Sequence, residues 1–326
     1  MDPVARIVEQ AKQTLRTIVL PEGNDSRTWQ TARRLVDEKI AKPIVLGSAA
    51  EIDAGLKNSG VSGEGIAVVD PATSDKREAY AQEFAKIRAK KGVTIEQARE
   101  TMKDMLFYGA MMVHMGDADG GVTGAAHTTG DVMRAAIQSI GMAPGISIVS
   151  SIFLMVMPDG RAFSFGDCAI VPQPDTEQLA SIAIASAGTH KALTGEEPMV
   201  AMLSFSTKGS AEHEMLDNVI AATKLVKEKR PDLKVDGELQ LDAAIVESVG
   251  SRKAPGSPVA GKANVLVFPD LNAGNIGYKL TERLAGAQAI GPIVQGLAKP
   301  FYDLSRGCSA DDIVKVCAIC SVVAGA

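Results

Sequence analysis

The 326-residue chain has no excess of basic residues and no long uninterrupted apolar segment. Its 34 Lys and Arg residues are outnumbered by 39 Asp and Glu residues, and the resulting net charge of −5 argues against a nucleic-acid-binding protein. The longest apolar run, 146–157, is interrupted by serines and is too short to span a bilayer. The N-terminal residues contain no apolar signal region. We therefore expect a cytoplasmic protein that binds neither nucleic acid nor a membrane.

Cysteine is scarce as well, and the four cysteines do not indicate a disulfide framework in a chain of this length. Cys317 and Cys320 form a Cys-x-x-Cys pair inside an apolar helical pattern, so we interpret them as small core residues. Among the four histidines only His127, in a Gly/Thr-rich loop, is a weak site candidate. Asp117 and Asp119 fit a solvent-exposed turn as well as they fit a metal site, and we assign no metal.

Two common nucleotide-binding fingerprints are also absent, because the chain contains neither Gly-x-x-x-x-Gly-Lys-Ser/Thr nor Gly-x-Gly-x-x-Gly. The composition, 46% hydrophobic and 22% charged residues, is that of a globular protein, and the length suits two domains. Strand and helix patterns alternate almost throughout. This alternation predicts an α/β fold with mainly parallel strands.

The predicted elements follow from the apolar periodicity and its interruptions. We predict strands at 17–20, 43–46, 66–69, 146–156, 162–165, 168–171, 200–203 and 265–268. We predict helices at 29–39, at 75–90, at 94–115 (one helix or two), from about 131, from 176, up to 229, after 242, after 269–277 and at 313–320. Asp159 and Gly160 fit a hairpin turn. The pattern resets at 143–145, and we place the boundary between a first domain (1–144) and a second (145–297) there.

The stretch 299–312 brings a hydroxyl, a cation, a thiol and two carboxylates together just before a mostly apolar helix. Ser309 is expected to cap that helix, with Asp312 at its N3 position. Asp312 is then either a helix cap alone or a functional carboxylate, and the residues by themselves favour neither. Capping does not explain why Ser305 and Arg306 are adjacent just upstream. A helix N-terminus beside an arginine is well suited to bind an anion.

Three strand-to-helix junctions, 122–130, 204–210 and 270–277, carry small and hydroxyl residues. Such junctions present backbone N–H groups and a helix dipole to an anion, and they gather at the carboxyl ends of parallel strands. One such loop alone is more often a plain turn. Together with Ser305 and Arg306 they favour a ligand with more than one phosphate, either a phosphorylated metabolite or a nucleotide-bearing cofactor. The candidate binding residues in the last two junctions are Ser206, Thr207, Lys208, Gly209, Asn272, Gly274 and Asn275.

Several long motifs resemble the phosphate acetyltransferases: KPFYDLSRGCS at 299–309, FPDLNAGNIGYK at 268–279 and MLSFSTKGS at 202–210. The stretches 235–243 and 124–131 agree, and the resemblance runs from residue 17 to the C-terminus. It implies a reversible reaction in which acetyl-CoA and phosphate give acetyl phosphate and CoA, with CoA as a substrate and no tightly bound cofactor. A functional partnership with acetate kinase is implied as well.

The resemblance also implies an architecture that periodicity alone does not reveal. It implies two α/β domains with a cleft between them, similar to the isocitrate and isopropylmalate dehydrogenases, and a homodimer. The segment 298–326 would return to the first domain.

Carried over residue by residue, the resemblance implies that Ser305, Arg306 and Asp312 are catalytic. Arg134 matches a CoA-binding arginine, and Arg88 matches a second one, although a solvated helix face explains Arg88 equally well. Asp312 would accept the proton of the CoA thiol. Arg306 would stabilise the oxyanion and the phosphate charge. Ser305 would donate to the carbonyl oxygen or orient Asp312.

Alternatives stay open at this stage. Cys308 offers a route through an acyl-enzyme, although the family favours direct transfer in a ternary complex. A phosphate butyryltransferase would carry the same motifs, because acyl preference depends on the shape of the pocket. A dehydrogenase of the related fold is another candidate. The last is a non-catalytic regulatory module like the similar C-terminal part of some malic enzymes, against which the intact Ser305, Arg306 and Asp312 argue.

Overall fold

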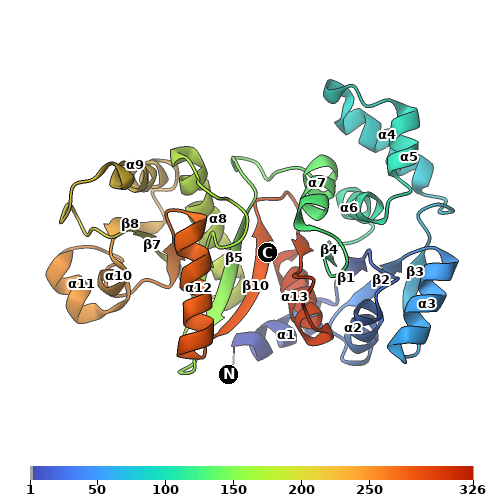
Figure 1. Cartoon of the computed structure of the whole chain (residues 1–326), viewed down its shortest axis with the longest axis horizontal. Coiled ribbons are helices and arrows are strands. Elements are labelled where there is room, and N and C mark those ends of the chain that lie inside the picture. Colours follow the sequence, from blue (N-terminus) through green and yellow to red (C-terminus); the bar gives the residue numbers. More distant parts are fainter. Residues whose placement is uncertain (1–2, 326) are drawn as a thin grey trace. The chain divides into compact units, whose positions relative to one another are not determined.

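The computed structural model describes residues 3–325, which form two compact units (Figure 1). One unit contains the chain up to Ala143 and takes it up again at Leu297, and the other is Pro144–Gly296. Each unit has a sheet of its own. The predicted α/β class with mainly parallel sheets is confirmed. The division into a first domain, 1–144 with 298–326, and a second domain, 145–297, stays a prediction.

The first unit alternates helices and strands along the chain (Figure 1). Its elements are α1 (Pro3–Thr14), β1 (Thr17–Leu20), α2 (Ser26–Asp37), β2 (Lys42–Leu46), α3 (Ala49–Ser59), β3 (Ala67–Val69), α4 (Arg77–Ile87), a 3-10 turn (Ala89–Lys91), α5 (Ile95–Thr101), α6 (Met105–Met115), β4 (Gly120–Thr123), α7 (Thr129–Ser139), β11 (Phe301–Asp303) and α13 (Ala310–Val323).

The sheet of this unit is wholly parallel, with the order β11-β4-β1-β2-β3. From β1 the chain proceeds outward to β3 and then returns to the other side of β1 as β4. The strand order therefore reverses between β1 and β4, the type of position at which α/β proteins bind ligands. Helix α13 packs on α1, α2 and both of these strands, while α6 packs on α7 and on the same two strands. Helices thus cover both faces of the sheet.

The second unit has a mixed six-stranded sheet, with the order β10-β5-β6-β9-β7-β8. Its elements are β5 (Ser150–Val156), β6 (Ala162–Gly166), α8 (Thr176–Thr194), β7 (Met199–Leu203), α9 (Glu214–Lys229), β8 (Lys234–Leu239), α10 (Leu241–Ile245), α11 (Glu247–Lys253), β9 (Val265–Val267), α12 (Leu271–Ala285) and β10 (Gln288–Gln295). Strands β6, β9, β7 and β8 run parallel, while β5 is antiparallel to both β6 and β10.

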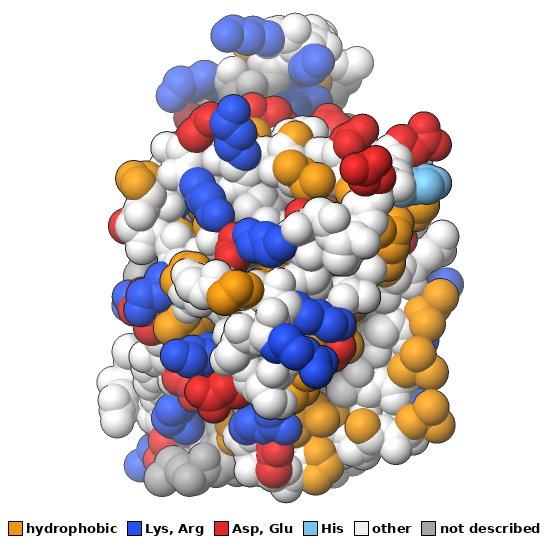
Figure 2. All heavy atoms as spheres, turned by 90° about the vertical axis from the view of Figure 1, so that its left-hand side faces the viewer, with side chains coloured by type: hydrophobic (Ala, Val, Ile, Leu, Met, Phe, Trp, Pro, Cys, Tyr) orange, Lys and Arg blue, Asp and Glu red, His pale blue; other side chains and the backbone are white. Residues whose placement is uncertain are grey.

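Two buried clusters form the core of the second unit. One lies between the sheet and helices α8 and α9, and includes Leu179, Met202 and Val219. The other includes Phe153 and Leu266 and extends to the ring of Tyr278 on α12, which stacks on Phe153. On the face drawn in Figure 2, basic and acidic side chains are interspersed.

Local signals in the sequence predicted several element boundaries. The predicted capping box of α13 is present, because Ser309 Oγ accepts from the Asp312 N–H while an Asp312 oxygen accepts from the Ser309 N–H. A second capping box, Thr94 with Gln97, starts α5. The predicted hairpin turn around Gly160 joins β5 and β6. Among the described residues, no helix has the length and apolar character needed to cross a bilayer.

The strand predicted at 168–171 is wrong. The buried carboxylate of Asp167 accepts hydrogen bonds from the backbone N–H groups of Ala169, Ile170 and Val171. The backbone of residues 169–171 curves around this side chain, so its N–H groups do not form the hydrogen bonds of a β-sheet. The strand predicted at 146–156 is also too long, since only Ser150–Val156 pairs with its neighbours.

The sequence analysis did not predict four strands: β4, β8, β10 and β11. Their residues do not show the alternation of apolar and polar side chains that is typical of a strand. In β8 the acidic residues Asp236 and Glu238 are buried and paired inside the protein. Strand β10 contains Pro292 and a register shift. Strand β11 is only three residues long. In β4, a Cβ at Gly120 would lie 2.4 Å from Cys320 Sγ, so this strand requires glycine for close packing.

Candidate active site

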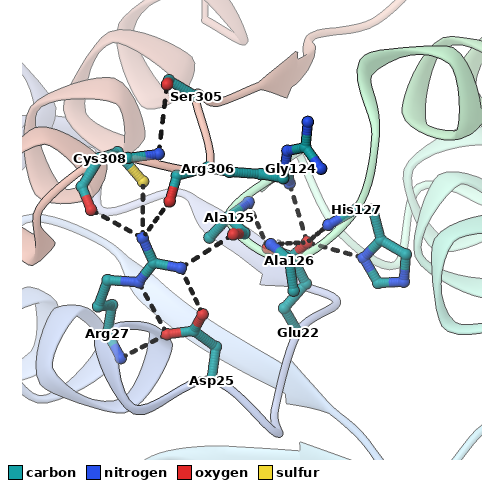
Figure 3. Close-up of polar contacts among 11 residues, drawn as sticks. Glu22, Asp25, Arg27, Gly124, Ala125, Ala126, His127, Ser305, Arg306 and Cys308 are labelled. Atoms are coloured by element: carbon teal, nitrogen blue, oxygen red, sulfur yellow. Dashed lines mark hydrogen bonds and ion pairs between the residues drawn. The ribbon is translucent and has the colours of Figure 1, made fainter.

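The candidate site of the first unit consists of three loops at the carboxyl ends of neighbouring strands. They are residues 21–25 after β1, residues 124–128 after β4 and residues 304–309 after β11. Because β11, β4 and β1 are adjacent and parallel, the loops lie side by side, as Figure 3 shows. Two of them flank the position where the strand order reverses.

A buried carboxylate organises the loop after β4. Glu22, only 2% exposed, accepts hydrogen bonds from the backbone N–H groups of four consecutive residues, 124–127, at 2.9–3.1 Å. His127 adds its ring, with Nδ1 2.7 Å from Glu22 Oε1. Burial alone would raise the pKa of Glu22, but these hydrogen bonds outweigh it, so its pKa lies below the ordinary value. Glu22 is therefore an anion held inside the protein.

One guanidinium connects all three loops (Figure 3). Arg27 donates from Nη1 to the carbonyl oxygens of Arg306 and Cys308, both at 2.8 Å. Its Nη2 donates to the carbonyl oxygen of Ala125 at 2.9 Å. Nε and Nη2 also donate hydrogen bonds to the two carboxylate oxygens of Asp25, at 3.0 and 2.6 Å. All five N–H donors of the arginine are thus used to hold backbone and side chain in place.

The predicted pair Ser305 and Arg306 lies on an exposed turn that this guanidinium holds. The turn is closed by a hydrogen bond from the Cys308 N–H to the Ser305 carbonyl oxygen at 2.9 Å. The Arg306 guanidinium makes no hydrogen bond or ion pair with any described residue. In Figure 3 it extends toward the turn that contains Gly124. The Ser305 hydroxyl accepts only a long hydrogen bond, 3.3 Å, from the Gly307 N–H. Both side chains are available to a ligand.

Cys308, beside this turn, is half-buried. Burial raises the pKa of its thiol to about 11, although the Arg27 charge acts in the opposite direction. A thiol with so high a pKa is almost entirely protonated at neutral pH and is a poor nucleophile.

Asp312 occupies the helix-capping position that the sequence predicted. One of its oxygens accepts from the Ser309 N–H at 2.9 Å and from the Ser309 hydroxyl at 2.8 Å. The side chain is exposed, so the carboxylate keeps accepting capacity toward solvent. Its neighbour Asp311 points elsewhere and forms ion pairs with Lys315 and Arg34, which lower its pKa. Only Asp312 lies on the side of the helix that carries Ser309.

A second buried carboxylate, Asp303, ends β11 directly behind the exposed turn. Its Oδ2 accepts from the Thr129 hydroxyl at 2.6 Å, and its buried Oδ1 makes no hydrogen bond with any described residue. Desolvation raises the pKa of Asp303 to about 6; the Thr129 hydrogen bond opposes this shift and the charge of Glu22 adds to it. Gly124 leaves space for this carboxylate, since a Cβ there would lie 2.3 Å from Oδ1.

The two predicted arginines lie on helices of the same unit. Arg134, on α7, is exposed and pairs with Asp131 at 3.0 Å, one turn after the helix N-terminus that begins at the Gly124–Thr128 loop. Arg88 caps the end of α4, which packs on α5 and α6. Its Nε atom is buried without a hydrogen-bond partner among the described residues. The structure thus places Arg134 near the three loops and gives no contact between Arg88 and them.

In the second unit, the predicted loop 206–209 follows β7. Its residues form hydrogen bonds and an ion pair with side chains on β8 and directly after it. Ser206 Oγ and the Gly209 N–H both donate to Glu238, at 3.0 and 2.6 Å. Lys208 pairs with the buried Asp236. Thr207 exchanges hydrogen bonds with Gln240. A phosphate at this loop would compete with carboxylates for its donors, and the binding role of these residues stays a prediction.

The remaining predicted residues start α12 after β9. Asn275 donates to the Cys168 carbonyl oxygen at 3.1 Å. Gly274 allows the helix to approach the neighbouring loop, because a Cβ there would lie 2.2 Å from the Asp167 carbonyl oxygen. Asn272 is exposed. Strands β6, β7, β8 and β9 end at this same edge of their sheet, so both predicted loops of this unit lie along it.

The sequence analysis did not predict three residues whose hydrogen bonds hold the site together: Glu22, Arg27 and Asp303. Glu22 follows the end of β1 directly, and Asp303 is the last residue of β11. A polar residue at the carboxyl end of a parallel strand is a signal that would have found both. Arg27 gave no local signal, because its partners are carbonyl oxygens about 98 to 281 residues away in the chain. Among residues 3–325, no group of three His, Cys, Asp or Glu side chains is placed to hold a metal ion.

Comparison with known proteins shows the family of the chain. The family model for phosphate acetyl/butaryl transferase matches residues 4–321. The chain is 52% identical over 99% of its length to a phosphate acetyltransferase of Thermoanaerobacterium thermosaccharolyticum, covering 100% of that protein. It is 50% identical, again over 99% of its length, to that of Acetivibrio thermocellus, covering 98% of it.

Solved structures show the same relationship. A phosphotransacetylase from Streptococcus pyogenes superposes with a TM-score of 0.93 and 43% identity, over 99% of this chain and 98% of that one. A proposed 4-hydroxythreonine-4-phosphate dehydrogenase from Salmonella typhimurium, 11% identical with a TM-score of 0.58 over 95% of this chain and 99% of that one, shares the fold alone. The predicted likeness to dehydrogenases is thus one of fold. The chain belongs to the phosphate acetyl/butaryl transferase family.

The raised pKa of Asp303 makes the stability of the protein depend on pH. Because burial raises the pKa of Asp303 to about 6 in the folded state from 3.8 in the unfolded state, folding stability is lost progressively as the pH rises from about 3.8 to about 6. The loss is complete above that range and absent below it. Asp303→Asn keeps an acceptor for Thr129 and removes the charge. It should stabilise the protein by on the order of 3 kcal/mol near pH 8 and by little near pH 4.

Chemical denaturation at both pH values measures this difference. Asp53→Asn, an exposed position on α3, is the matched control and should change stability by less than about 0.5 kcal/mol at either pH. An Asp303→Asn variant with the same effect at both pH values would show that Asp303 is not a raised-pKa group.

Proposed function

We propose that this protein transfers an acetyl group between CoA and inorganic phosphate, so that acetyl-CoA and phosphate give acetyl phosphate and CoA. The observation that carries the proposal is the exposed Ser305–Arg306 turn, which Arg27 holds beside the N-terminus of α13. The guanidinium of Arg306 pairs with none of the described residues. Membership in the family and the identity to named phosphate acetyltransferases support it.

In this proposal the transfer is direct and takes place in a ternary complex. The thiol of CoA attacks the carbonyl carbon of acetyl phosphate after giving its proton to Asp312. Arg306 stabilises the negative charge on the carbonyl oxygen and the phosphate, for which an unpaired guanidinium is well suited. Ser305 donates to the carbonyl oxygen or orients Asp312. The raised pKa of Cys308 supports this route over an acyl-enzyme.

CoA is a substrate in the proposal and no tightly bound cofactor takes part. Arg134 and Arg88 would bind phosphates of CoA; the exposed guanidinium of Arg134 and the unpaired Nε of Arg88 support this. Ser206, Thr207, Lys208, Gly209, Asn272, Gly274 and Asn275 would contribute to binding CoA or phosphate.

We propose further that the protein is a cytoplasmic homodimer that works with acetate kinase. A stripe of exposed apolar side chains on one face of α12 supports the dimer: Ile276, Leu280 and Leu284 are 58%, 52% and 80% exposed and follow each other at intervals of four residues. Hydrophobic side chains gather along the right-hand edge of Figure 2. Sedimentation equilibrium measures the mass of the assembly directly.

The test of the function is a thioester assay. The protein should convert CoA and acetyl phosphate to acetyl-CoA, with a lower kcat/KM for propionyl and butyryl phosphate. The family includes butyryl transferases, so a clear preference for butyryl phosphate would establish phosphate butyryltransferase, the second candidate. Formation of no thioester from any of the three acyl phosphates would overturn the proposal.

Asp312→Asn separates the two roles of this residue. Asn retains a helix cap, so the fold should persist, but it cannot accept a proton. If Asp312 is the base, kcat for thioester formation should fall by roughly 10²–10⁴-fold while the KM values hold.

Asp311→Asn is the matched control. Asp311 is one residue away and also exposed, but it faces Lys315 and Arg34, so its variant should be nearly as active as the parent. Both variants are first compared with the parent by thermal melting. A folded Asp312→Asn variant as fast as Asp311→Asn would leave Asp312 as a cap alone.

A further inference from the structure

His127 is held like a catalytic histidine and has no role in the reaction as described above. Its side chain is 30% exposed, and Nδ1 lies 2.7 Å from the buried Glu22 carboxylate. Because a carboxylate only accepts, Nδ1 carries the hydrogen of that bond. The other ring nitrogen, Nε2, makes no hydrogen bond with any described residue. The Glu22 carboxylate therefore fixes the orientation of the ring, and Nε2 remains available to a ligand.

The position of the ring in the fold is that of a ligand-binding residue. His127 lies in the loop after β4, beside the place where the strand order reverses, and the loop leads into the N-terminus of α7. The adjacent loop after β11 carries Arg306, whose side chain extends toward this turn in Figure 3. A phosphate bound by Arg306 would lie between these two loops.

The proposed reaction requires a second proton transfer besides the one assigned to Asp312. In the direction of thioester formation, the carbon–sulfur bond forms and the bond between the acetyl carbon and a phosphate oxygen breaks. Acetyl phosphate is a dianion near neutral pH, so the departing phosphate would leave as a trianion unless it received a proton. The thiol loses one proton and the product phosphate gains one. An acid near the phosphate is needed to complete this balance.

We propose that His127 is this acid: its Nε2–H gives a proton to the departing phosphate oxygen, and in the reverse direction Nε2 accepts the proton of the attacking phosphate. The inference rests on the proposed function. Glu22 stays ionised throughout and stabilises the imidazolium. The proton that Asp312 takes from the thiol returns to His127 through solvent after product release, so each turnover leaves the protein unchanged.

The electrostatic surroundings of the ring agree with this role. The hydrogen bond to Glu22 raises the pKa of His127 above its ordinary value, burial lowers it, and the charges of Glu22, Asp104 and Asp131 add to the increase. Asp104 caps α6 and Asp131 lies in the first turn of α7. A bound phosphate would favour the imidazolium further.

The test is the pH dependence of kcat/KM for acetyl phosphate in the thioester-forming direction. An acid must be protonated to act, so the wild-type value should fall as the pH rises through the pKa of His127. His127→Asn places an amide N–H where Nδ1 was and keeps the bond to Glu22, but it has no proton to give. The variant should lose about 10²–10⁴-fold in kcat/KM, and the alkaline decline should disappear.

Two further variants make the result specific. Glu22→Gln removes the charge that stabilises the imidazolium, so the alkaline decline should move to lower pH; this holds even if His127→Asn fails to fold. His114→Gln is the matched control, because His114 has a carboxylate neighbour, Glu83 at 3.7 Å, but lies on α6 outside the three loops. Its rate and profile should match the wild type.

A folded His127→Asn variant with the wild-type rate and decline would overturn the proposal, as would a decline that Glu22→Gln leaves in place. A merely structural role would lower the rate at every pH and leave the decline unchanged. Failure of the proposed function is a different result, because the wild-type protein itself would then form no thioester.

Discussion

The site depends on one guanidinium whose donors are all used inside the protein. Arg27 connects the loops after β1, β4 and β11, which are separated by most of the chain, through hydrogen bonds to three carbonyl oxygens. Its own position is fixed by the two-pronged contact with Asp25. A lysine would supply the charge but not the planar array of donors. Arg306 can therefore remain exposed and without a partner among the described residues, because another arginine holds the turn on which it lies.

Two buried carboxyl groups, Glu22 and Asp303, influence the charge near the Ser305–Arg306 turn. Glu22 is kept ionised by four backbone N–H groups and His127, whereas Asp303, with one hydroxyl partner, has a pKa raised to about 6. Two neighbouring buried carboxyl groups do not both ionise easily, so the difference in hydrogen bonding decides which of them ionises at the lower pH. The surface facing a ligand carries the Arg306 guanidinium and the His127 ring, whose pKa is raised by the hydrogen bond to Glu22, and both groups suit a phosphate-bearing substrate.

Sequence patterns predicted the features that depend on residues close together in the chain. The alternation of elements gave the α/β class, and the cap formed by Ser309 and Asp312 was predicted because its residues are three positions apart. Strand β4 was missed because its two glycines serve contacts with distant side chains. Arg27 was missed for the same reason, since its partners come together only in the folded chain. The return of the C-terminal segment to the first unit was implied by family resemblance alone, because nothing in a local pattern states which strand will be its neighbour.

The most direct test of this account is kcat for thioester formation by Arg27→Lys, compared with Arg34→Lys on the same helix. Among residues 3–325, Arg34 pairs only with the exposed Glu38 and Asp311, so its variant should keep the parental rate. If Arg27 positions the Ser305–Arg306 turn, its variant should remain folded and lose on the order of 10²-fold in kcat, as expected for a displaced catalytic group. An Arg27→Lys variant as fast as Arg34→Lys would contradict the account, because the turn would then hold its geometry without this arginine.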